Sequence, residues 1–237
     1  MIRISSPGQT SKKNPAVVPE MMSSRPCSRM FPHVAVGGLA MILTIGIATL
    51  LGAASGFFGG VVDTIVSAVT NALLSIPSIL ILVVFAKAFG QSIQTIVIGI
   101  ALLAWPYTAR IVRAVILSVR EKEFVEAAKA LGTPRWRIMI RHLIPNALGP
   151  IVVAASLTIG AAILLESALS FLGVGIGQPT ATWGSLLNQG YQELNNPGFV
   201  GFFYSLWPGL LILVTVLSFN YIGDALRDAF DPRSLER

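Results

Sequence analysis

The lysines and histidines of this sequence argue against chemistry performed by the chain itself. ATP hydrolysis needs a glycine-rich loop that ends in Gly-Lys-Ser or Gly-Lys-Thr, because this loop and its lysine hold the phosphates. No lysine follows a glycine among the five present, which are Lys12, Lys13, Lys87, Lys122 and Lys129. The two histidines, His33 and His142, have no cysteine or second histidine at metal-ligand spacing. We therefore expect no catalytic residue, no metal site and no cofactor in this chain.

Glu166 is the one acid that lies well inside a long apolar run, residues 148–174. A carboxyl group in the interior of a membrane is costly, so it faces a cavity or a polar partner. Glu166 then either touches a transported substrate or serves as a hydrogen-bonded structural group near the outer end of its helix. We favour the structural role.

The overall composition indicates a membrane protein. Of the 237 residues, 54% are hydrophobic and only 12% are charged, whereas about a quarter of a soluble domain is charged. The single cysteine, Cys27, excludes an intrachain disulfide. Lipid is therefore the expected solvent for much of the chain.

Five apolar runs divide the chain, and each approaches the length of about 20 residues that spans a bilayer. They cover residues 34–58, 64–86, 93–109, 148–174 and 201–223. Their apolar residues are continuous and do not alternate, which predicts helices and not the strands of a barrel. The expected fold is all-α and polytopic, with five transmembrane helices. Residues 1–33 are polar and rich in proline, and we expect a poorly ordered tail there without a signal peptide.

The basic residues predict the orientation in the membrane. Segment 110–147 holds eight of them and the C-terminal end three more, whereas segment 175–200 holds none. The positive-inside bias places the first two in the cytoplasm and the third outside, which argues against nucleic-acid binding. We expect a permease domain over 34–223, including a cytoplasmic loop over 113–147, and a cytoplasmic tail over 224–237. With five spans, residues 1–33 lie outside despite five basic residues, so either this tail is translocated against the bias or an ordinary first span is missing.

Segment 120–146 predicts a helix–turn–helix between two spans. Its first helix has one apolar face, at positions i, i+3, i+4 and i+7: Phe124, Ala127, Ala128 and Leu131. Gly132 is placed to end this helix in the left-handed conformation, Thr133 to cap the second helix, and Pro145 to end it. Such a helix either docks into a groove of a partner or lies on the membrane surface.

The motifs of this segment resemble those of a known family. Glu126-Ala127-Ala128, followed by Gly132 and Pro145 at fixed spacing, is similar to the EAA signature of bacterial ABC importer permeases. Further motifs resemble the peptide and nickel branch of that family, and they follow in the right order along the chain: Ile76-Pro77-Ser78, Arg141 to Asn146, Glu166 to Gly173, Trp183-Gly184 and Phe219 to Arg233. The chain resembles the C-type dipeptide and oligopeptide permease subunit, whose family normally has six spans.

This resemblance implies an inner-membrane importer that works by alternating access. A second permease subunit completes the pathway for peptides or nickel, two separate ATPase subunits bind ATP-Mg, and an extracytoplasmic substrate-binding protein delivers the cargo. The resemblance assigns the contact with an ATPase subunit to one set of residues: Phe124, Glu126, Ala127, Ala128, Leu131, Gly132 and Pro145. Glu126 would pair with a basic or amide group of the ATPase; the alternative is a solvated partner of Lys122 or Lys129. The competing functions are a secondary transporter or channel, and a membrane scaffold without transport.

Overall fold

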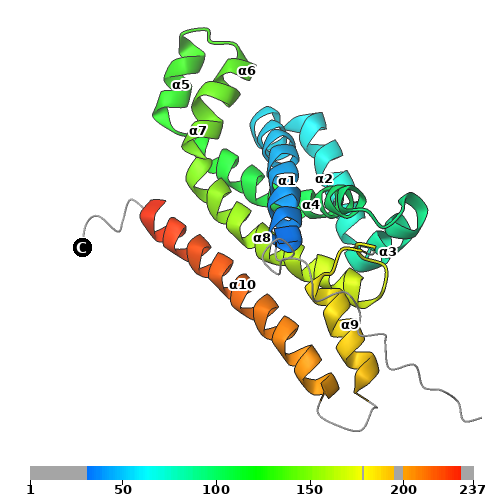
Figure 1. Ribbon diagram of the computed structural model, residues 1–237. Helices are drawn as coiled ribbons and strands as arrows, with labels where there is room; N and C mark the ends of the chain where they lie inside the picture. The colour runs from blue at the N-terminus through cyan, green and yellow to red at the C-terminus, as the bar shows by residue number, and fades with distance from the viewer. Residues whose placement is uncertain (1–30, 178, 195–199, 231–237) are drawn as a thin grey trace, which may run out of the picture.

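The computed structural model describes residues 31–177, 179–194 and 200–230, and within these ranges the chain is helical without strands. Four long helices and one bent helix pair form a bundle, and a small group of short helices projects from one end (Figure 1). The elements in order are α1 (Phe31–Phe58), α2 (Gly60–Leu74), α3 (Ser78–Phe89), α4 (Ile93–Val119), α5 (Glu123–Ala130), α6 (Arg135–Ile138), the π-helix η3 (Met139–Leu143), α7 (Ile144–Asn146), α8 (Leu148–Phe171), α9 (Trp183–Glu193) and α10 (Val200–Phe230).

The all-α prediction is confirmed, and so is the number of spans if a bent pair is counted as one. Helices α1, α4, α8 and α10 are each long and apolar enough to cross a membrane, and α2 with α3 forms the fifth candidate. The second run was expected to be one continuous helix over 64–86, and this is wrong. The two helices are bent by 85°.

Pro77 explains the bend between α2 and α3. Proline has no N–H group to donate to the helical ladder, and its ring disfavours the α conformation of the residue before it. Helix α2 ends at Leu74, and Pro77 then caps α3 with an extended backbone, at φ −56° and ψ 117°. Helix α3 therefore starts afresh in a new direction.

Three predicted boundaries move, because charged residues do not end these helices. Helix α4 continues through Arg110 and Arg113 to Val119, so the inter-span loop starts at residue 120 and not at 113. Helix α10 continues to Phe230, so the expected tail over 224–237 is helical in its first part, and 231–237 lie outside the described residues. Helix α1 begins at Phe31, within the expected tail over 1–33, of which 1–30 lie outside the described residues.

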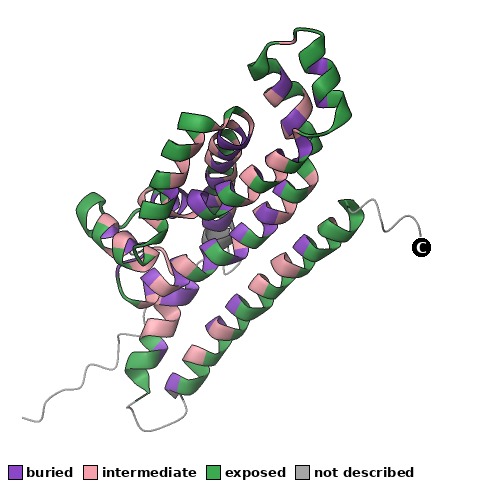
Figure 2. Ribbon diagram, turned by 180° about the vertical axis from the view of Figure 1, so that it is seen from behind, coloured by how far each residue is buried: buried purple, intermediate pink, exposed green. Residues whose placement is uncertain are grey.

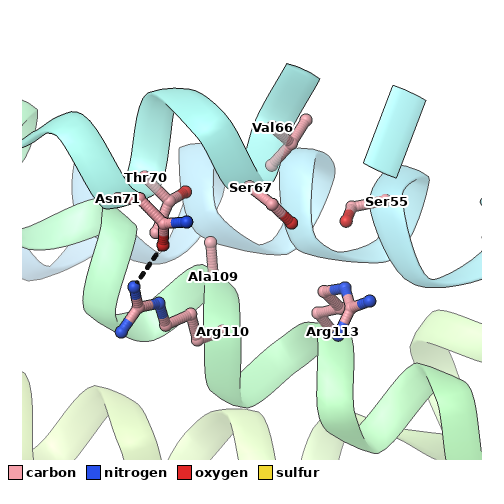
Figure 3. Close-up of a pocket in the computed structure, with 8 residues that line it drawn as sticks. All are labelled: Ser55, Val66, Ser67, Thr70, Asn71, Ala109, Arg110 and Arg113. Atoms are coloured by element: carbon pink, nitrogen blue, oxygen red, sulfur yellow. Dashed lines mark hydrogen bonds between the residues drawn. The ribbon is translucent and has the colours of Figure 1, made fainter. Parts of the chain in front are cut away.

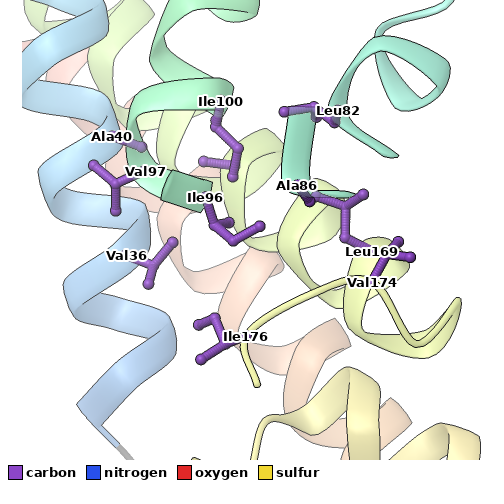
Figure 4. Close-up of a cluster of buried hydrophobic side chains, with 11 residues drawn as sticks. Val36, Ala40, Leu82, Ala86, Ile96, Val97, Ile100, Leu169, Val174 and Ile176 are labelled. Carbon is purple, nitrogen blue, oxygen red and sulfur yellow. The ribbon is translucent and has the colours of Figure 1, made fainter. Parts of the chain in front are cut away.

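The core lies where α1, α4 and α8 pack together, as the buried residues in Figure 2 show. Gly52 of α1 lets the α4 backbone approach, because a β-carbon there would lie 2.6 Å from the Ala109 carbonyl oxygen. Such close contacts at small residues are typical of membrane helix pairs. The buried side chains of the cluster in Figure 4 come from four helices and the segment after α8: Val36, Ala40, Leu82, Ala86, Ile96, Val97, Ile100, Ala162, Leu169, Val174 and Ile176.

Helix α9 was missed in the sequence. It lies between α8 and α10 and packs against both. A capping box starts it: the Ser185 backbone N–H donates to Thr182 Oγ1 at 3.1 Å, and the Thr182 backbone N–H donates to Ser185 Oγ at 2.9 Å. Helix α10 packs along α8 and α9 on one side only and exposes apolar side chains on the other (Figure 2), as a helix in lipid does.

Candidate functional site

Helix α5 opens the short helical segment over 120–147, called here the α5–α7 segment. Two glutamates, Glu123 and Glu126, occupy its first turn, where the helix dipole favours negative charge. Gly132 ends the helix with φ +72°. The Gly132 N–H donates to the Lys129 carbonyl and the Thr133 N–H to the Ala128 carbonyl, which is the Schellman pattern. The predicted role of Gly132 in the turn is thus confirmed.

The two sides of α5 differ sharply in burial. Val125 and Ala128 are buried against a cluster that includes Ile138 and Leu143. Phe124, Ala127 and Leu131 stay exposed, with Leu131 at 85% of its full exposure. The four-residue face expected from the sequence is therefore divided, because Ala128 fixes the helix to its own segment. We call Phe124, Ala127 and Leu131 the outer face of α5.

The second half of the α5–α7 segment departs from a simple helix. The helix after the turn begins at Arg135, and Pro134 holds the cap position without a side-chain cap, so Thr133 does not cap it as expected. Pro145 does not end the helix either: it lies within α7, directly after the π-helical turn over 139–143. Proline cannot donate to the carbonyl four residues earlier, and the wider π-helical turn over 139–143 accommodates the missing hydrogen bond. Pro145 therefore lies at the join between the π-helical turn and α8.

A polar groove runs between α5 and the end of α1. Its volume is about 600 Å³, which is in the size class of ligand pockets. Its lining carries charges of both signs: Phe57, Phe58, Arg120, Glu121, Glu126, Lys129, Thr133, Arg135 and Ile138. Among the described residues Glu126 makes no ion pair, so the expected alternative of a partner at Lys122 or Lys129 is not seen. The Glu126 carboxylate is exposed and accessible to a cation or amide of another chain.

Polar contacts fasten the end of the bundle from which the α5–α7 segment emerges. The guanidinium of Arg113 in α4 donates to both carboxylate oxygens of Asp63 in α2, each at 2.6 Å. Ser55 of α1 donates to Asp63 at 2.5 Å, and Arg120 donates to the Gly56 carbonyl at 2.9 Å. The sequence analysis did not predict this network. Its only signal in the sequence is that an acid, Asp63, and a base, Arg113, lie at the same end of two spans. The network joins α1, α2 and α4 directly before α5.

Glu166 lies near the C-terminal end of α8, which ends at Phe171. That end of α8 points away from α5, as Figure 1 shows. Its side chain is fully buried, and Ser170 donates to it at 2.7 Å. The segment leading into α9 packs closely here, since a β-carbon on Gly184 would overlap the Ser167 carbonyl. Glu166 thus belongs to the packed junction of α8 and α9.

No group of three or more His, Cys, Asp or Glu side chains suitable for a metal occurs among the described residues. The arrangement instead offers an exposed apolar helix face on a segment that is fastened to the spans. The fold and this element define a polytopic helical membrane protein with an exposed apolar helix face at one end.

Comparison with known proteins identifies the family. Residues 48–236 match the family described as binding-protein-dependent transport system inner membrane component, and the chain belongs to this family. It is a multi-pass protein of the inner membrane. The oligopeptide transport system permease protein OppC of Haemophilus influenzae is 42% identical over 84% of this chain and 62% of that protein. The dipeptide transport system permease protein DppC of Alkalihalophilus pseudofirmus is 39% identical over 84% of this chain and 64% of that protein.

The fold also matches a solved structure. A chain of the MetNI methionine ABC transporter in an inward-facing conformation has a TM-score of 0.68, with 22% identity over 89% of this chain and 98% of that chain. The chain described here spans less than two thirds of the length of the two curated relatives above.

Proposed function

We propose that this chain is the permease subunit of an ATP-binding cassette importer for peptides and forms half of the translocation pathway. A second permease subunit forms the other half. Two separate ATPase subunits bind ATP-Mg, and an extracytoplasmic binding protein delivers the peptide. When the two ATPase subunits close and open, the pathway is exposed first to one side of the membrane and then to the other, which is alternating access.

The observation that carries the proposal is the exposed outer face of α5 on a fastened segment. Phe124, Ala127 and Leu131 expose apolar surface to water, while Val125 and Ala128 hold the helix in place. A short helix with an apolar face fits a groove on a partner protein. Since α5 follows α4 directly and the segment leads into α8, a displacement of α5 is transmitted to both of these spans.

The names of the relatives favour peptides as the substrate class, because the two compared above are named as oligopeptide and dipeptide permeases. We extend that substrate class to this chain. The basic residues of the α5–α7 segment favour a cytoplasmic location for it and for the end of α10, and we propose that the segment meets the ATPase subunits there. Glu126 then pairs with a basic or amide group of the ATPase, and Pro145 shapes the path into α8.

The test is uptake of a radiolabelled dipeptide into proteoliposomes that contain the complete complex with its binding protein. We expect uptake with ATP and none with a non-hydrolysable analogue. Glu126→Lys should reduce both uptake and co-purification of the ATPase subunits. Lys87→Glu is the matched control, because it reverses an exposed charge in the last turn of α3 and should leave co-purification unchanged.

The same preparation separates the competing functions. A secondary transporter would take up peptide with an ion gradient alone, and a scaffold would take up none under either condition. Uptake without ATP, or ATPase subunits that do not co-purify with the wild-type chain, would refute the proposal.

A further inference from the structure

Arg110 occupies an unusual place for a cation. It lies within α4, nine residues before the helix ends at Val119, or about 13 Å along the axis at 1.5 Å per residue. An arginine this far inside a span faces a polar partner or a water-filled cavity, because lipid does not solvate it. Arg110 is exposed in this position, so the groups around it show what it faces.

Such a cavity is present beside Arg110, between α1, α2 and α4 (Figure 3). Its volume is about 350 Å³, which is the size of a small-molecule site. One wall carries hydroxyl and amide groups from α1 and α2, and α4 supplies the arginines opposite. The polar lining consists of Ser55, Ser67, Thr70, Asn71, Arg110 and Arg113.

The two arginines of this cavity differ in their partners. Arg113 is neutralised by Asp63, whose two carboxylate oxygens accept from Arg113 Nε and Nη2 at 2.6 Å each. Arg110 donates from Nη2 to Asn71 Oδ1 at 2.6 Å, as Figure 3 shows, and has no ion pair among the described residues. A guanidinium has five N–H donors. The cavity thus holds the positive charge of Arg110 without a neighbouring carboxylate, and Arg110 has further N–H groups that can donate to a ligand.

We propose that Arg110 binds the carboxylate of a transported peptide, and that this cavity forms part of the translocation pathway. This inference rests on the function proposed above. The planar guanidinium matches a carboxylate in a bidentate geometry. Asn71 holds the guanidinium in place, and the hydroxyls of Ser67 and Thr70 give the peptide further polar contacts.

The experiment measures occupancy of the cavity in the complete complex, without the binding protein, so that its selectivity does not enter. Ser67→Cys in a Cys27→Ser background places a thiol in the lining, and mass spectrometry follows maleimide labelling at that residue. A dipeptide with a free C-terminal carboxylate should slow the labelling, and the same dipeptide with a C-terminal amide should not.

Arg110→Gln should raise the dipeptide concentration needed for protection about 10-fold or more, since hydrogen bonds to charged groups contribute roughly 1.5–3 kcal/mol. Arg110→Lys should restore part of the effect. Lys87→Gln, which removes an exposed cation outside the cavity, should retain full protection. In complexes with the binding protein, Arg110→Gln should also lower ATP-driven uptake of the carboxylate peptide.

Several results would overturn the inference while leaving the proposed function intact. In a wild-type complex that shows ATP-driven uptake, equal protection by the carboxylate and the amide peptide would exclude carboxylate recognition. Unchanged protection in Arg110→Gln would exclude Arg110. Labelling slowed by phosphatidylglycerol vesicles and not by peptide would assign the cavity to a lipid headgroup. Absence of ATP-driven uptake in the wild type would instead refute the proposed function.

Discussion

The ion pair between Asp63 and Arg113 offers a quantitative test of how α2 is held against α4. Both Nε–Oδ1 and Nη2–Oδ2 are 2.6 Å, and the two side chains are 25% and 36% exposed. Exposed pairs contribute about 0.2–1 kcal/mol, whereas breaking a buried pair costs about 3–5 kcal/mol. At this intermediate exposure we expect Asp63→Asn to cost about 1–2 kcal/mol.

This cost translates into a measurable change in melting temperature. One kcal/mol shifts the Tm of a 150–250-residue domain by about 2–4 °C, so Asp63→Asn should lower the Tm in detergent by roughly 2–8 °C. Arg113→Gln should have a similar effect. The exchange of both residues, Asp63→Arg with Arg113→Asp, should recover part of the loss because the charges again oppose one another. Asp224→Asn, at an exposed acid of α10, serves as the control.

Additive losses of stability in the exchanged double variant would show that Asp63 and Arg113 do not interact. If the exchanged double variant loses as much stability as two independent charge reversals, the side chains do not interact across α2 and α4. A loss in Asp63→Asn no greater than in Asp224→Asn would lead to the same conclusion.

Three further substitutions test other parts of the structure. Glu166→Gln should retain ATP-driven uptake. Glu166→Leu should lower the Tm, because it leaves the buried Ser170 hydroxyl without its partner at a cost of about 1–3 kcal/mol. Uptake abolished by Glu166→Gln at unchanged Tm would contradict a structural role for Glu166. Gly132→Ala should speed hydrogen exchange of the α5 amides through a left-handed penalty of about 1–2 kcal/mol, and equal rates in Gly132→Ala and wild type would count against the turn. Gly52→Val should lower stability by about 1–3 kcal/mol through overpacking against α4, while Gly46→Val meets open space on the same helix and should not.

Much of the fold follows from the sequence because membrane spans are long and locally determined. Continuous apolar runs specify α1, α8 and α10, and Gly132 specifies its turn, since few residues other than glycine adopt φ +72° cheaply. The 85° bend at Pro77 was missed because an apolar run has the same composition whether its helix is straight or broken. Helix α9 was missed because its main signal was a Thr182–Ser185 capping box, and the segment is short and polar.

The candidate site was predictable in outline and not in detail. Periodicity located the apolar positions of α5, but periodicity cannot separate Ala128 from Leu131, because burial depends on where α6 and η3 fold back. The Asp63–Arg113 pair and the cavity at Arg110 depend on how α2 crosses α4, and residues 50 positions apart in sequence meet there. Long-range contacts of this kind have no local pattern to reveal them.

Leu131 is the residue at which to test the proposal that the outer face of α5 binds an ATPase subunit. Leu131 and Leu172 are both exposed, at 85% and 55%, and each forms the C-terminal cap of its helix before a left-handed glycine. The measurement is the amount of ATPase subunit that co-purifies with each variant. We expect strong loss of the ATPase subunit with Leu131→Asp and wild-type recovery with Leu172→Asp. Full recovery of the ATPase subunit with Leu131→Asp would show that the outer face of α5 does not bind it.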